Sequence, residues 1–202
     1  MSVALTYCNS LKPTVYKIGY LGKGYYVPSQ PYYEIWKQML RRCYDFKNQE
    51  IKHPSYIECS VHESWLNYQN FADWCNNNGY NKILFIDKDI LLKGNKIYGP
   101  DTCCFVNRHL NNLFTKSNVA RNGLPIGVIL NGSNFQARCG FVDSNGKKSR
   151  KLLGTYITKI EAFKVYKKAK EEYIKEMADK YKSEISEKVY NALYSYVVEI
   201  TD

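Results

Sequence analysis

The apolar residues between positions 31 and 75 recur at intervals of three and four, the spacing that places side chains on one face of an α-helix. We expect one helix to begin at Pro31 and to end near Arg41 and Arg42, with an apolar face made of Tyr32, Ile35, Trp36, Met39, Leu40 and Cys43. We expect a second helical stretch over residues 63–74, with an apolar face made of Trp65, Tyr68, Phe71, Ala72 and Cys75. The large aromatic side chains of both faces are predicted to form a core.

The pattern changes after residue 82. Residues 83–86 form an apolar run rich in β-formers and predict a strand, and residues 107–114 predict a short helix. Three antiparallel strands are then expected, because sequences typical of hairpin turns separate apolar stretches at residues 127–130, 135–142 and 150–156. Two helices should follow, one capped by Thr158 and Glu161 and one running from Ser183 or Ser186 to Val198, which should bury Ile185, Val189, Leu193 and Val197.

This order of elements predicts an α+β fold. An N-terminal module of helices and a hairpin should be followed by a three-stranded antiparallel sheet packed on a helix, and then by a further C-terminal helix. Residues 116–123 are the best candidate for a linker, so the predicted domains are residues 1–116, 117–182 and 183–202.

Composition narrows the class of protein. The 202 residues are 45% hydrophobic and 24% charged, which argues against disorder and against a coiled coil. No apolar run reaches the roughly 18 residues that can span a bilayer, so we expect no membrane partner. The seven cysteines contain no C-x-x-C pair, which favours buried thiols over a structural zinc site and a cytoplasmic location, in the host cell cytoplasm if a phage encodes the protein.

The net charge of +10 favours a polyanionic partner, and the charge is concentrated. Residues 117–170 carry 11 basic and 2 acidic residues, whereas residues 171–202 carry 4 basic and 8 acidic residues. We therefore expect double-stranded DNA to bind the basic segment. The acidic C-terminal helix would repel DNA and is a candidate for binding a protein partner.

Alternation along the strands predicts which basic residues face solvent. On the central strand Gln136 and Arg138 should lie opposite the apolar residues Ala137 and Cys139. On the third strand Arg150, Leu152 and Gly154 should lie on the same open face, with Lys147 and Lys148 in the adjoining turn. Arg and Gln read base edges in the major groove and Lys contacts phosphate, so this face is typical of a DNA-binding ribbon. An ordinary solvated face of a basic domain is the alternative.

Residues 127–169 resemble the Apetala-type, ethylene-response-factor DNA-binding domain. The matching points are Gly127-Val128, Ala137-Arg138, residues 153–156 (LGTY), Glu161-Ala162, and Tyr166 with Ala169. The resemblance implies that the sheet lies in the major groove of DNA. Leu152 stands where a tryptophan is common in that family.

Residues 31–116 resemble phage HNH-type homing endonucleases that carry an Apetala-type domain. The similarity lies in W-x-x-M-x-x-R-C-Y from Trp36, the W-x-x-x-x-x-F-x-x-W stretch from Trp65 and DKDILLKGNKIYGPDTCCFV from Asp87. It implies a metal-dependent nuclease with Mg²⁺ or another divalent ion, Asp87, Asp89 and Asn95 as metal residues, and Asp87, His109 and His62 as catalytic candidates.

One departure from the nuclease pattern divides the functional hypotheses. Lys88 stands where the family usually has histidine, and a lysine ammonium is a poor general base near neutral pH. The leading hypothesis is a nuclease with Arg41 and Arg42 as auxiliary phosphate contacts. The alternative is a DNA-binding regulator or inhibitor of a host system, built on a nuclease scaffold that has lost its activity.

Overall fold

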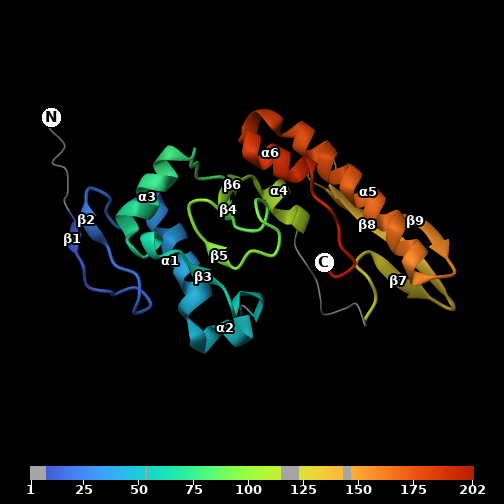
Figure 1. Ribbon diagram of the computed structural model, residues 1–202, viewed down its shortest axis with the longest axis horizontal. Coiled ribbons are helices and arrows are strands. Elements are labelled where there is room, and N and C mark those ends of the chain that lie inside the picture. Colours follow the sequence, from blue (N-terminus) through green and yellow to red (C-terminus); the bar gives the residue numbers. More distant parts are fainter. Residues whose placement is uncertain (1–7, 53, 115–122, 143–146) are drawn as a thin grey trace. The chain divides into compact units, whose positions relative to one another are not determined.

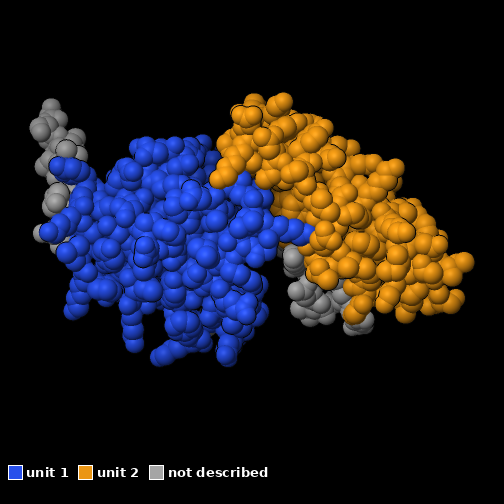
Figure 2. All heavy atoms as spheres, in the orientation of Figure 1, with its two compact units in different colours: residues 1–107 blue, residues 108–202 orange. Residues whose placement is uncertain are grey.

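The computed structural model describes residues 8–52, 54–114, 123–142 and 147–202 (Figure 1). The chain forms two compact units, residues 1–107 (unit 1) and residues 108–202 (unit 2), which Figure 2 colours blue and orange. Helices and strands are mixed in both units, so the predicted α+β class is confirmed. The predicted linker falls largely on residues 115–122, and the predicted turn on residues 143–146; both lie outside the described residues.

Unit 1 is built from short elements around an aromatic core. Its elements are β1 (Cys8–Ser10), β2 (Gly22–Gly24), α1 (Pro31–Tyr44), α2 (Phe46–Lys52), η1 (Pro54–Tyr56), β3 (Ser60–Val61), η2 (Glu63–Leu66), α3 (Tyr68–Asn77), β4 (Phe85–Asp87), β5 (Ile97–Tyr98) and β6 (Cys104–Val106). β1 pairs with β2 and β4 with β6, both antiparallel, whereas β3 pairs with β5 in parallel. These small sheets position the loop that leads from β4 to β5.

The core of unit 1 joins the two predicted helical faces. Trp36 on α1 is fully buried, and its indole N–H donates to the Trp65 carbonyl at 2.6 Å. The helical stretch predicted over residues 63–74 is interrupted at Asn67, whose backbone is extended and whose side chain accepts the Gln69 N–H as the N-cap of α3. The interruption arises because Asn caps a helix better than it continues one.

Unit 2 is a three-stranded antiparallel sheet with helices. Its elements are α4 (Arg108–Asn111), η3 (Asn112–Phe114), β7 (Val128–Asn131), β8 (Asn134–Val142), β9 (Lys148–Tyr156), α5 (Lys159–Lys180), η4 (Lys182–Glu184) and α6 (Glu187–Tyr194). The strand order is β7-β8-β9, as predicted. β7 is much shorter than β8, so the β8 edge beyond Ala137 has no β7 partner; there the Val142 N–H donates to the Tyr173 hydroxyl at 2.9 Å.

Helix α5 covers one face of this sheet (Figure 1). Thr158 and Glu161 form the predicted capping box at its start. Ala137 and Cys139 of β8 are fully buried, as the alternation predicted. The prediction for the last helix is partly wrong: it ends at Tyr194, Val189 and Leu193 are buried, and Val197 is exposed while Val198 is buried instead.

The third strand contains a bulge that corrects one face assignment. Ala137 pairs with Gly154 but Arg138 pairs with Leu152, so Leu153 is an extra residue in β9. An extra residue reverses the alternation beyond it. Gly154 therefore lies on the helix-covered face, not on the open face as predicted, and Thr155, the partner of Gln136, lies on the open face.

Gly127 is the tightest backbone approach in unit 2. It has φ of +76°, and a Cβ there would overlap the Tyr166 ring of α5. We expect Gly127→Ala to destabilise the protein by about 2–4 kcal/mol, through left-handed backbone strain and overpacking. Gly132→Ala is the matched control, because Gly132 has φ of +62° with no atom near its Cβ position and should cost only about 1 kcal/mol. Urea unfolding of both variants measures the difference, and equal losses would contradict the packing argument.

Candidate metal site and nucleic-acid interface

The loop after β4 contains the three residues predicted to hold a metal. Asp87 is the last residue of β4, and its Oδ1 accepts the N–H groups of Asp89 at 2.7 Å and of Ile90 at 2.8 Å. These two bonds close a tight turn directly after the strand, as Asp side chains commonly do. The carboxylate of Asp87 therefore has a structural role in this turn.

Asn95 fastens the other end of the same loop. Its Nδ2 donates to the carbonyls of Lys88 at 2.8 Å and Ile97 at 2.7 Å, and its Oδ1 accepts the Ile97 N–H at 3.1 Å. Asn95 is buried, so these bonds satisfy a side-chain amide that would otherwise be costly to bury. The Asn95 amide therefore links three backbone groups of the loop.

Lys88 is the buried centre of this loop. Its ammonium lies 2.9 Å from each carboxylate oxygen of Asp89 and donates to the Asn95 carbonyl at 2.7 Å. It also lies 6.0 Å from the ring centroids of both Tyr56 and Tyr98. An ammonium has three N–H donors, and here three oxygens accept them. Lys88 thus supplies the positive charge that compensates Asp89.

The pKa shifts in this loop argue against acid–base catalysis by Lys88. Burial alone would lower the pKa of the Lys88 ammonium, but the hydrogen bond and charge of Asp89 outweigh burial, and the pKa is raised. A base must lose its proton near the working pH, and Lys88 holds its proton more firmly than usual. Burial raises the pKa of Asp87 despite its two backbone hydrogen bonds.

The two histidines proposed as bases lie in different units. His62 is exposed in unit 1 and caps η2: its Nδ1 accepts the Ser64 N–H at 3.3 Å and lies 2.8 Å from the Ser64 hydroxyl. His109 belongs to unit 2, where its ring stacks on Tyr181 at 6.0 Å between centroids.

Other predictions for unit 1 concern cations and thiols. Arg41 is exposed, whereas Arg42 is partly buried with its guanidinium 5.5 Å from the Tyr56 ring centroid, so the two arginines face different surroundings. Five buried cysteines lie in unit 1, namely Cys43, Cys59, Cys75, Cys103 and Cys104, and Cys139 is buried in unit 2. Within the described parts of the chain, no group of three or more His, Cys, Asp or Glu side chains could hold a metal ion.

The open face of the sheet in unit 2 gathers the predicted DNA contacts. We call it the basic face, made of Gln136, Arg138, Lys148, Arg150, Leu152 and Thr155. Arg138 is exposed, and its guanidinium donates twice to the Gln136 Oε1, at 3.1 Å from Nε and 2.7 Å from Nη2. Neither β8 nor β9 contains an acidic residue. The basic face is therefore a cationic surface on which one arginine is hydrogen-bonded to its neighbour Gln136.

Two residues of this surface escaped sequence reasoning. Thr155 was missed because a bulge has no reliable signal in the sequence. Ile129, the partner of Gln136, adds an exposed apolar side chain on the edge strand. Lys147, as predicted, is exposed directly before β9.

No family model, curated protein or solved structure that was compared with this chain matches it. The comparison therefore adds no family and no activity to the geometry above. In the described part of the chain, no helix is long and apolar enough to cross a membrane.

The geometry predicts opposite effects for two substitutions of Asp87. Asn keeps an oxygen that can accept both N–H groups and removes the cost of burying a charge, so Asp87→Asn should be at least as stable as the native protein at pH 7. Asp87→Ala should lose about 1–3 kcal/mol because it leaves those N–H groups unpaired.

The pH dependence gives an independent check. A raised pKa of Asp87 means that the folded state favours the protonated form, so its destabilising effect grows as pH rises through the folded pKa. The gain from Asp87→Asn should therefore shrink as pH falls through the folded pKa, and it should be lost below the ordinary aspartate pKa. Urea unfolding at several pH values measures it, and a stability loss for Asp87→Asn as large as that for Asp87→Ala would contradict this role.

Proposed function

We propose that the protein binds double-stranded DNA through the basic face of its three-stranded sheet. The observation that supports this most directly is the basic face itself, where Arg138, Arg150 and Lys148 are exposed on strands without a single acidic residue. The resemblance of residues 127–169 to Apetala-type domains points the same way. Three strands about 4.8 Å apart span about 10 Å of backbone, within the roughly 12 Å width of the major groove.

Arg138 is the best candidate for reading a base. The Gln136 oxygen holds its guanidinium in place before any DNA arrives, which lowers the entropy lost on binding. A guanidinium presented in this way can donate to the O6 and N7 atoms of guanine. Leu152, opposite Arg138, can contact a thymine methyl group.

Unit 1 fits a nuclease-like scaffold better than a working nuclease. Asp87 and Asn95 each use Oδ1 to accept backbone N–H groups, and Asp89 is paired with Lys88. A metal ion at these residues would compete with the Lys88 ammonium for the Asp89 carboxylate. This favours the non-catalytic alternative, a DNA-binding protein that acts by occupying DNA or by bringing a partner to it.

DNA binding should depend steeply on salt and on the basic face. Each phosphate contact releases counterions, so affinity should fall by at least about tenfold between 50 and 200 mM salt. Arg138→Ala should weaken binding to the preferred sequence by about 10- to 100-fold, and Lys148→Ala should weaken binding to all sequences alike. Lys164→Ala, on an exposed position of α5, is the control. Fluorescence anisotropy with duplex DNA measures the affinity of all three variants. An affinity that changes neither with salt nor on substitution of Arg138 would refute the interface.

The nuclease alternative is tested with supercoiled plasmid in Mg²⁺, in Mn²⁺ and in EDTA. We expect a mobility shift in all three conditions and no nicking, because the Lys88 ammonium occupies the carboxylate of Asp89. Asp89→Ala is the control variant. Metal-dependent nicking by the native protein that Asp89→Ala abolishes would establish an endonuclease and overturn the non-catalytic assignment.

A further inference from the structure

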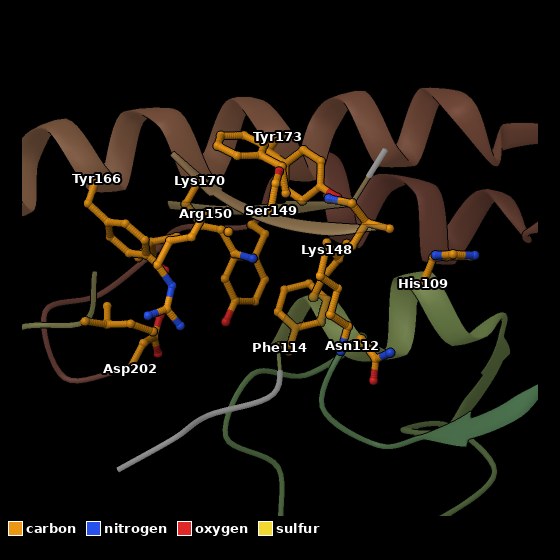
Figure 3. Close-up of a pocket in the computed structure, with 17 residues that line it drawn as sticks. His109, Asn112, Phe114, Lys148, Ser149, Arg150, Tyr166, Lys170, Tyr173 and Asp202 are labelled. Atoms are coloured by element: carbon orange, nitrogen blue, oxygen red, sulfur yellow. The ribbon is translucent and has the colours of Figure 1, made fainter. Parts of the chain in front are cut away.

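Unit 2 contains a cavity of about 480 Å³ at the β8 edge that β7 leaves unpaired. Figure 3 shows side chains from α5, from β9 and from the segments beneath the sheet converging on it. Its volume lies within the range of small-molecule sites. All of its lining residues belong to unit 2.

Three cationic side chains line the cavity, those of Lys148, Arg150 and Lys170. Among the described residues, none of these three side chains forms a hydrogen bond or an ion pair with an acceptor. Lys170 lies between α5 and the sheet, where its ammonium is 5.7 Å from the Tyr173 ring centroid. Burial lowers the pKa of Lys170, which shows that the charged form is poorly compensated there. An anion would supply the missing partner.

Two neutral donors point to the same edge. The Tyr173 hydroxyl accepts the Val142 N–H, which leaves its own proton free to donate. The N–H groups of Arg138 and Val142 both point away from β9. Alternate residues of a strand direct their N–H groups to the same side, so the N–H of Gly140, which lies between these two residues, also points away from β9. Gly140 also lines the cavity.

The rest of the wall is aromatic. Phe114, Phe141, Tyr166 and Tyr196 line the cavity together with Tyr173. Aromatic side chains stack on nucleobases, and Lys and Arg with backbone N–H groups bind phosphate. His109 adds an ionisable group, and Asp202 adds a carboxylate to the same wall.

We propose that this cavity binds a nucleotide, with the phosphate held by Lys170 and Arg150 and the base against the aromatic wall. This site goes beyond the proposed DNA interface, since Lys170 and Tyr173 lie on the helix-covered side of the sheet. Arg150 and Lys148 belong to both sites, so a bound nucleotide and DNA compete for them.

Calorimetric titration of the full chain with deoxyadenosine monophosphate tests the proposal, with deoxyadenosine as the ligand lacking phosphate. We expect one site with a dissociation constant below about 1 mM, and at least about tenfold weaker binding of the nucleoside. Lys170→Met should weaken nucleotide binding at least about tenfold while it keeps the stem that packs on the sheet. Lys168→Met, an exposed lysine of the same helix, is the matched control and should bind normally.

The outcomes separate the two sites. Lys170→Met should retain DNA affinity, and its melting temperature should equal or exceed that of the native protein because a desolvated charge is removed. The cavity proposal is overturned if the native protein does not bind the nucleotide at 5 mM, or if Lys170→Met binds it as tightly as Lys168→Met does. A failure of DNA binding with intact nucleotide binding would refute only the interface on the basic face.

Discussion

A single helix can cover only one face of a three-stranded sheet, and most of unit 2 follows from this constraint. Helix α5 buries Ala137 and Cys139 and leaves Arg138 and its neighbours in water. The bulge at Leu153 then decides which residues of β9 share that exposed side. Lys170 of α5 lies near the β8 edge of this sheet, where it lines the cavity together with Gly140 and Val142.

The polar loop of unit 1 is held together by its own side chains. The Lys88 ammonium neutralises the Asp89 carboxylate, and the Asn95 amide bonds to the backbone at both ends of the loop. The charged and polar groups buried in this loop are therefore compensated by one another.

The sequence allowed the fold to be predicted wherever one local signal governs an element. The face of α1, the strands of unit 2 and the capping box at Thr158 each come from spacing or from a local hydrogen bond, and the structure confirms them. Gly154 was assigned to the wrong face because a bulge depends on pairing between strands. Val198 is buried in place of Val197 because its backbone bonds to Lys167 and Glu171 on α5, a contact between distant segments.

The candidate sites were harder to predict than the fold. Asp87, Asp89 and Asn95 lie at the end of β4 and in the loop that follows it, and their hydrogen-bond partners depend on the path of the backbone, which no motif describes. The sequence shows that Lys88 stands where a histidine base is expected, but only the three-dimensional structure shows that its ammonium pairs with Asp89. The cavity left no signal in the sequence, since its lining comes from segments as far apart as His109 and Asp202.

The short β7 has one more consequence. A strand edge without a partner can recruit a strand from another molecule and start aggregation. In this protein the Gly127 carbonyl accepts the Arg138 N–H at 2.8 Å, and the Tyr173 hydroxyl accepts the Val142 N–H. A side chain of α5 thus replaces a longer β7 at the far end of this edge, and occupies an N–H group that a strand of another molecule would need for pairing.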